Sequence, residues 1–181
     1  MQSLRCYFQT VVGFWKFVLT KQTQQLNINM DSLSATALQV AITQIGQEEK
    51  PHGSNWGIPV KNYLASVGIN FPASWCMAFV YWCFNEASKQ NKITNTAIKT
   101  GGVLYAWNNA PKEKKSLKPS VGSVFIMDFG KGLGHTGFVE KFDAQYIYTV
   151  EGNTNDNGSR EGIEVCRRKR ALTSIKGYIK Y

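Results

Sequence analysis

Residues 71–83 read FPASWCMAFVYWC, and the rest of the chain is organised around this stretch. Pro72 ends an extended approach, a small polar residue follows, and an apolar run then begins at helical spacing. The pattern predicts that Cys76 lies in the first turn of a buried helix. Unpaired amide groups and the positive end of the helix dipole favour a thiolate at such a position. We therefore expect Cys76 to be a nucleophile, and the remaining residues should include its base.

The composition is that of a folded protein with a basic surface. Of the 181 residues, 43% are hydrophobic and 18% are charged, which excludes a chain that is disordered throughout. Lysine and arginine outnumber aspartate and glutamate by 21 to 12, so the net charge is +9. Such an excess favours anionic partners, namely nucleic acid, anionic lipid or acidic wall polymers, although a merely solvated basic surface has the same composition.

None of the four cysteines has the spacing of a zinc site, because no CxxC pair occurs. Cys76 and Cys83 are two helical turns apart, so along one helix they would be separated by about 10 Å, which is too far for a disulfide. A disulfide between Cys83 and Cys166 stays open as an alternative. We expect Cys83 to be a small buried hydrophobic residue.

Residues 1–30 differ from the rest of the chain. Residues 11–19 are apolar, but Lys16 interrupts the run and no small-residue cleavage site follows it. The run is also too short to span a bilayer. We expect residues 1–30 to be an N-terminal extension that need not be ordered, and residues 31–181 to form the folded domain, with no membrane-spanning segment.

The periodicity of the folded domain changes from helical to extended along the chain. Helices are expected at residues 34–46, 59–67, 76–89 and 101–110. Residues 112–118 are expected to form a charged surface loop. Strands are expected at residues 123–129, 135–142, 146–150, 162–168 and 175–181. Helices followed by an antiparallel meander of strands predict an α+β fold.

Only two histidines, His52 and His135, are available as the base for Cys76. His52 lies in a Pro-His-Gly loop, a position typical of an exposed histidine without a chemical role. His135 opens a predicted strand, and glycines on both sides let a substrate or another segment approach its ring. A strand-edge histidine bonded to a neighbour would explain the residue too, but Cys76 and His135 begin elements that could face each other. We therefore expect His135 to be the base.

A third group usually orients a catalytic histidine and fixes its tautomer. The strand that ends at Val150 is followed by Glu151 and Asn153, which alternation places on the same face, with Gly152 between them leaving room for the imidazole. A carboxylate would stabilise an imidazolium beside a thiolate, whereas an amide would only orient the ring. The sequence leaves open which of the two contacts His135.

Residues 153–164 have the ligand spacing of an EF-hand calcium loop. The first position is a neutral asparagine, however, and the flanks are predicted strands instead of helices. Asparagine and glycine also favour a tight hairpin. We therefore expect no metal and no other cofactor.

Four short motifs follow one another along the chain: WCMAFV at residues 75–80, VGSVF at 121–125, GHTGFV at 134–139 and VEGN at 150–153. Together they resemble the CHAP family of cysteine, histidine-dependent amidohydrolases and peptidases. They occur in the family's order, and the likeness covers residues 33–181. The resemblance implies a papain-like α+β fold of the NlpC/P60-like superfamily, with N-terminal helices packed on a five- to six-stranded antiparallel sheet. It also implies cleavage of an amide bond in peptidoglycan.

Matching positions carry the family's site residues over to this chain. By resemblance, Cys76 is the nucleophile, His135 the base, and Glu151 and Asn153 the polar members of the site. Residues 53–57, GSNWG, also resemble a segment ahead of the nucleophile in bacterial relatives. We place that segment at the cleft, and the expected substrate-binding residues are Asn55, Trp56 and Trp75.

Two positions depart from the family pattern. The family commonly has Gly-Asp where this chain has Gly122-Ser123, which should change a turn and not the chemistry. The small residue that usually follows the cysteine is replaced by Met77, which should narrow the cleft beside the scissile bond.

The sequence therefore predicts a monomeric hydrolase that acts on the peptidoglycan of a bacterial cell wall, in the periplasm, after secretion or delivered by a phage. The bond cleaved is the N-acetylmuramoyl-L-alanine amide, a stem-peptide bond or a cross-bridge bond. The alternative is a non-catalytic module of the same fold that binds wall or other polyanions through residues 167–170, RRKR. Strand alternation and the lack of an aromatic platform favour a solvated strand end there, and no nucleic-acid partner is expected.

Overall fold

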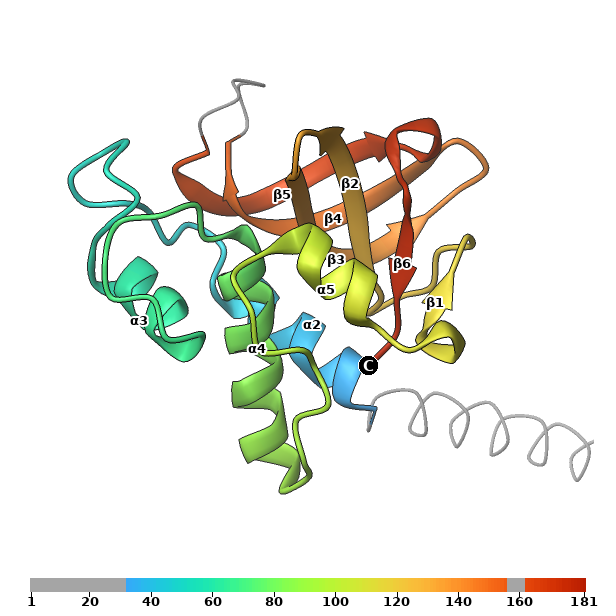
Figure 1. The fold of residues 1–181 in the computed structure, drawn as a ribbon, viewed down its shortest axis with the longest axis horizontal. Coiled ribbons are helices and arrows are strands. Elements are labelled where there is room, and N and C mark those ends of the chain that lie inside the picture. Colours follow the sequence, from blue (N-terminus) through green and yellow to red (C-terminus); the bar gives the residue numbers. More distant parts are fainter. Residues whose placement is uncertain (1–31, 156–161) are drawn as a thin grey trace, which may run out of the picture. The chain divides into compact units, whose positions relative to one another are not determined.

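In residues 32–155 and 162–181, which the computed structural model describes, four α-helices precede a six-stranded antiparallel sheet (Figure 1). The helices are α2 (Leu33–Thr43), α3 (Ile58–Ser66), α4 (Cys76–Asn91) and α5 (Val103–Asn109). The predicted α+β class and all four predicted helices are confirmed, with ends that differ by a few residues. The predicted N-terminal extension lies outside the described residues, as do residues 156–161 of the loop with EF-hand spacing.

The sheet has the strand order β1-β6-β2-β3-β4-β5. The strands are β1 (Lys115–Ser116), β2 (Val124–Gly130), β3 (Leu133–Phe142), β4 (Tyr146–Thr154), β5 (Glu164–Ala171) and β6 (Gly177–Ile179). The five predicted strands are confirmed, but the meander runs only from β2 to β5. After the short 3-10 helix η2 (Leu172–Ser174), β6 returns to pair with β2 on its other side.

The sixth strand, β1, was not predicted from the sequence. Its two residues follow the 3-10 helix η1 (Lys112–Lys114) in the lysine-rich segment that we expected to be a loop. Their pairing partners, Ile179 and Tyr178 of β6, lie more than sixty residues further along the chain. Such a short strand exists only because its partner is already in place, so no local pattern marks it.

Helix α4 begins inside the hydrophobic core, where it packs against β3 and β4. Every residue from Cys76 to Val80 is buried, and of these only Cys76 keeps a small exposed fraction, 5%. The Phe79 and Phe84 rings both contact Phe138 of β3, with centroid distances of 6.5 and 5.4 Å. Burying aromatic side chains of this size stabilises the fold by about 1.5–3 kcal/mol each. The start of α4 is therefore held rigidly against the sheet.

The other face of the sheet carries a second, smaller hydrophobic cluster, made by Phe125, Met127, Val139, Ile147 and Tyr178. Leu172 and Ile175, in and just after η2, pack against it. His135 lies an even number of residues from Val139 on β3, and Glu151 lies an even number from Ile147 on β4. Strand alternation therefore places both side chains on the face of this second cluster.

Three of the four cysteines lie in the described part of the chain, and none of them forms a disulfide. The alternative disulfide between Cys83 and Cys166 is therefore wrong. Cys83 is completely buried on α4, as predicted, and burial raises the pKa of its thiol well above the ordinary value. Within residues 32–155 and 162–181, no helix has both the length and the apolar character needed to cross a membrane.

Candidate active site

Cys76 is the first residue of α4, as the sequence predicted. It is 5% exposed, and the preceding residue, Trp75, has the non-helical φ of −119° at the N-cap position. The N–H groups of a first helical turn have no acceptor within the helix, and they point toward the N-terminal end. The Cys76 side chain therefore lies where a negative charge is favoured by the helix dipole.

The His135 ring lies between Cys76 and Glu151. Its Nε2 is 2.7 Å from Oε2 of Glu151, and the Cys76 side chain lies near enough to the ring to raise its pKa. Since Nε2 faces the carboxylate, Nδ1 is the ring nitrogen that remains for Cys76. The side chain of His135 is 13% exposed, so the ring is not sealed from solvent. The sequence left open which residue contacts the imidazole, and the structure places Glu151 there.

The Glu151 carboxylate is completely buried and has several donors. Its Oε1 accepts the hydroxyl of Thr149 at 2.6 Å and Nε of Arg170 at 2.9 Å. Its Oε2 accepts Nε2 of His135 and Nη2 of Arg170. Burial alone would raise the pKa of Glu151, but its hydrogen bonds to Arg170 and His135 outweigh burial and lower the pKa to about 2. Glu151 is therefore a carboxylate at neutral pH.

The pKa of His135 is raised to about 9. Burial opposes this by favouring the neutral ring, but the interactions of the ring with Cys76 and Glu151 outweigh it. An imidazolium is thus stable at neutral pH between a sulfur on one side and a carboxylate on the other.

Two glycines make this packing possible, and one of them has a different role from the one predicted. A Cβ on Gly137 would lie 2.7 Å from the Val150 carbonyl oxygen and 2.9 Å from Cγ of Glu151, so Gly137 leaves the room that the carboxylate needs. We expected Gly152 to leave room for the imidazole. Instead, a Cβ on Gly152 would lie 2.6 Å from the Trp75 ring, because alternation turns that position toward α4.

The Asn153 side chain does not lie beside that of Glu151 on one face of β4, although strand alternation predicted that it would. A β-bulge between Glu151 and Thr154 and a φ of +54° at Asn153 take its side chain out of the strand pattern. Its Oδ1 accepts the backbone N–H of Trp75 at 3.1 Å, and its Nδ2 donates to the Gly162 carbonyl oxygen at 2.8 Å. Asn153 therefore holds the residue that precedes Cys76, while Glu151 contacts the imidazole.

Trp75, expected to contact substrate, is completely buried instead. Its ring stacks on Tyr63 with a centroid distance of 5.5 Å, and its indole N–H donates to Oε1 of Glu49 at 2.8 Å. A hydrophobic ring of this size that follows a proline-ended loop is drawn into the core with the helix that it starts. The Trp75 ring is thus a packing element in this structure.

Asn55 and Trp56 lie in the loop before α3. The backbone N–H of Asn55 donates to Oε2 of Glu49 at 2.8 Å, and Asn55 lines a polar cavity of about 100 Å³ together with Ser74 and Asn153. Trp56 is half-buried at the edge of the core. The structure thus brings Asn55 close to Asn153, whereas the Trp56 ring lies against the Lys61 ammonium group, which is 5.5 Å from its centroid.

Sequence reasoning missed two residues that support the site, Glu49 and Arg170. Glu49 is 3% exposed and joins the Asn55 loop to the Trp75 ring. Arg170 was read as part of a solvated strand end, yet its guanidinium binds Glu151. Strand alternation offered a signal, because Arg170 and Glu151 share one face of the paired strands β4 and β5 once their register is known.

The described residues do not form a metal centre. Within residues 32–155 and 162–181, no group of three or more His, Cys, Asp or Glu side chains is arranged to hold a metal ion. Thr154 pairs with Glu164 across β4 and β5, so strands flank the loop that has EF-hand spacing. His52, the other histidine, is exposed in its loop.

Comparison with protein families finds one match. Residues 68–153 match the family model of the CHAP domain, and the matched segment includes Cys76, His135, Glu151 and Asn153 but not Arg170. No curated protein and no solved structure matches the sequence. CHAP domains are typically cysteine- and histidine-dependent amidohydrolases, and they generally act on peptidoglycan. The resemblance seen in the sequence is confirmed over residues 68–153, which match the CHAP domain.

Proposed function

We propose that this protein hydrolyses an amide bond of peptidoglycan, with Cys76 as the nucleophile, His135 as the base and Glu151 as the group that orients His135. The observation that carries the proposal is the position of the His135 ring, whose Nε2 lies 2.7 Å from Oε2 of Glu151 and whose pKa is raised by the neighbouring Cys76 side chain. A nucleophile, a base and an orienting carboxylate in this order are what cysteine-dependent acyl transfer requires. The N-acetylmuramoyl-L-alanine amide and the stem or cross-bridge peptide bonds are all substrates for this chemistry.

The first half of the reaction acylates the enzyme. The Cys76 thiolate attacks the amide carbonyl carbon, and the carbonyl π electrons move to oxygen. When the tetrahedral intermediate collapses, the C–N bond breaks and the leaving amine takes a proton from the His135 imidazolium. The products of this half are a thioester on Cys76, a free amine and a neutral His135.

The second half regenerates the enzyme. Neutral His135 takes a proton from water while the water oxygen adds to the thioester carbonyl carbon. Collapse of this intermediate breaks the C–S bond, releases the carboxylic acid and restores the Cys76 thiolate beside the His135 imidazolium. The raised pKa of His135, about 9, suits the resting state, because the thiolate needs a cationic neighbour at neutral pH.

The backbone N–H of Cys76 is the natural donor for the oxyanion of both intermediates. It belongs to the first turn of α4, where amide groups have no intrahelical acceptor and the helix dipole favours negative charge. Asn153 supports this geometry as a positioning residue, because its Oδ1 accepts the N–H of Trp75, one residue before Cys76. Losing that bond would free the backbone just ahead of the nucleophile.

The test is hydrolysis of purified peptidoglycan by Cys76→Ala and His135→Ala proteins. Each substitution should abolish the release of new amino groups, which is measured by labelling the free amines. His52→Ala, a histidine substitution in an exposed loop, is the matched control and should keep full activity. Full activity of Cys76→Ala would refute the mechanism. Mass spectrometry of defined muropeptides after digestion then identifies which amide bond is cleaved.

A further inference from the structure

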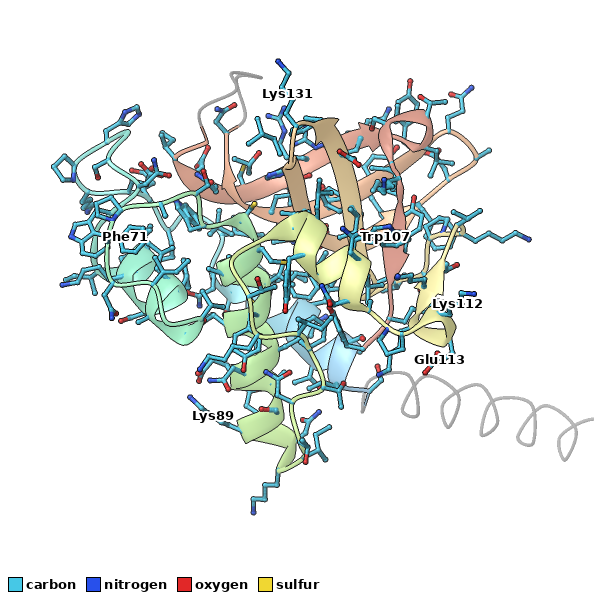
Figure 2. The ribbon with its side chains drawn as sticks, viewed as in Figure 1. Phe71, Lys89, Trp107, Lys112, Glu113 and Lys131 are labelled. Carbon is cyan, nitrogen blue, oxygen red and sulfur yellow. The ribbon has the colours of Figure 1, made fainter. Side chains whose placement is uncertain are left out.

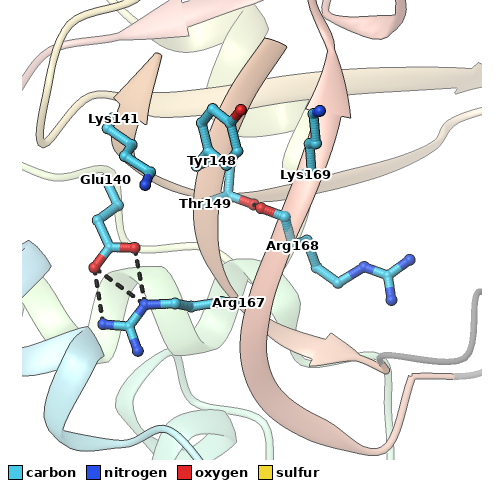
Figure 3. Close-up of a pocket in the computed structure, with 7 residues that line it drawn as sticks. All are labelled: Glu140, Lys141, Tyr148, Thr149, Arg167, Arg168 and Lys169. Carbon is cyan, nitrogen blue, oxygen red and sulfur yellow. Dashed lines mark hydrogen bonds and ion pairs between the residues drawn. The ribbon is translucent and has the colours of Figure 1, made fainter. Parts of the chain in front are cut away.

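A groove with basic walls lies over β3, β4 and β5 (Figure 3). It has a volume of about 740 Å³. Lys141 near the end of β3 and Lys169 on β5 lie on either side of Tyr148 of β4, as Figure 3 shows. Tyr148 alternates with the buried Thr149, and thus projects from the opposite face of the sheet to Glu151. The residues that line the groove do not include Cys76, His135 or Glu151, so an occupant of the groove would leave the Cys76 site open.

The charges around the groove are unequal. Three cations, Lys141, Arg167 and Lys169, face the groove with one carboxylate, Glu140, whereas the Arg168 guanidinium points away from it and donates to the Asn155 carbonyl oxygen (Figure 3). Arg167 neutralises that carboxylate, with Nη2 2.8 Å from Oε1 and Nε 2.9 Å from Oε2 of Glu140. A second carboxylate, that of Asp143, lies at the rim, where it accepts the Tyr148 hydroxyl at 3.0 Å. The cations outnumber the carboxylates, so the groove favours an anionic occupant.

Two tyrosine rings hold the lysines in place. The ammonium group of Lys169 lies 3.8 Å from the centroid of the Tyr146 ring and 5.6 Å from that of Tyr148. The ammonium group of Lys141 lies 4.7 Å from the Tyr148 centroid. These cation–π contacts order the two ammonium groups on rigid strands without neutralising them. They also occupy faces of the tyrosine rings on which a nucleic-acid base would have to stack.

We propose that this groove binds a phosphodiester polymer without bases, of the polyol-phosphate kind that is attached to peptidoglycan. Compact ammonium charges bind phosphate without demanding a fixed fork geometry, so successive units of a flexible polymer fit equally well. The choice of a wall polymer rests on the peptidoglycan substrate proposed above, whereas the anionic character of the occupant does not. A second contact with the wall would hold the domain near its substrate and raise the local substrate concentration.

The test measures binding of poly(glycerol phosphate) to Cys76→Ala protein by fluorescence anisotropy, so that hydrolysis does not enter the result. In that background, Lys141→Gln/Lys169→Gln should weaken binding by about tenfold. The matched control is Lys112→Gln/Lys118→Gln, which removes the same charge from exposed lysines outside the groove; Lys112 extends from η1 in Figure 2. The control pair should change binding by no more than about twofold.

Three results would overturn the proposal: no binding of the polymer, an equal loss in both lysine pairs, or tighter binding of an oligothymidylate with the same number of phosphates. The last result would assign the groove to nucleic acid. Thermal unfolding checks that the variants fold, and the single variant Lys169→Gln replaces the double variant if that one does not. With Cys76 restored, the lysine variants should still cleave short soluble muropeptides, so a failed hydrolysis assay and a failed binding assay are separate outcomes.

Discussion

The Arg170 guanidinium binds both oxygens of the Glu151 carboxylate, with Nε 2.9 Å from Oε1 and Nη2 2.5 Å from Oε2. The Glu151 side chain is completely buried, and that of Arg170 is 22% exposed. Burial penalises a carboxylate that has no cationic partner, so such a group takes up a proton more readily. The contact of Arg170 with both oxygens keeps Glu151 ionised, and the ionised carboxylate faces Nε2 of His135.

Arg170→Gln should therefore raise the pH at which activity is lost on acidification. Removing the guanidinium removes the first hydrogen-bonding cause of the low pKa of Glu151, so the acidic limb of the kcat/KM profile should move upward by about one unit or more. Arg170→Lys restores a cation but not the paired hydrogen bonds of the guanidinium, so it should reverse part of this upward shift. The measurement is kcat/KM against pH on a soluble muropeptide.

The matched control for Arg170 is Arg167→Gln on the same strand. Arg167 binds Glu140 at the surface, away from Glu151. Arg167→Gln should therefore leave the acidic limb of the kcat/KM profile unchanged. If Arg170→Gln lowered activity equally at every pH, its role would be structural and the electrostatic explanation would be wrong.

His135 should stabilise the fold in a pH-dependent way. Its folded-state pKa of about 9 exceeds the ordinary value of 6.5, so its stabilising contribution is complete below pH 6.5 and is lost as the pH rises through 9. The shift corresponds to about 3 kcal/mol. Urea denaturation measures the unfolding free energies of the wild type and of His135→Gln. The difference between them should shrink by about 3 kcal/mol as the pH rises from 6.5 through 9. Cys76→Ala should reduce the effect, because Cys76 is one of its causes.

Two neighbouring glycine positions should respond differently to alanine. A Cβ on Gly152 meets the Trp75 and Phe79 rings, so Gly152→Ala should lower the unfolding free energy by about 1–3 kcal/mol through overpacking. A Cβ on Gly137 meets Glu151 itself, so Gly137→Ala should in addition lower kcat by about tenfold or more through misplacement of the carboxylate. Circular dichroism melts and kcat well below the melting temperature separate the two effects. Equal kcat values for both variants would contradict this assignment of Gly137.

Iodoacetamide at neutral pH should alkylate Cys76 before Cys83. Cys76 begins α4 beside the His135 ring, whereas Cys83 is completely buried and burial raises the pKa of its thiol. Peptide mapping by mass spectrometry measures the extent of modification at each cysteine over time. His135→Ala should slow the reaction of Cys76, since the cationic partner of the thiolate is lost. Faster modification of Cys83 would show that Cys76 is not activated, and would favour a binding module without catalysis.

Local patterns in the sequence were sufficient for the class of fold and for the centre of the candidate site. Apolar residues at helical spacing marked all four helices, and alternating residues marked five of the six strands. The start of α4 at Cys76 followed from the proline-ended loop and the apolar run behind it. The choice of His135 over His52 followed from the glycines around it, and the structure brings its ring to Cys76.

Only the tertiary structure decided how the supporting residues are arranged. A bulge in β4 separates Asn153 from Glu151, and alternation cannot foresee a bulge because one extra residue reverses every later position. The pairing of Arg170 with Glu151 depends on the register of β5 against β4, and that of Glu49 with Trp75 depends on a loop folding onto the core. Short-range periodicity determines which residues face inward, but the partner of a buried charge is set by contacts between segments distant in the chain.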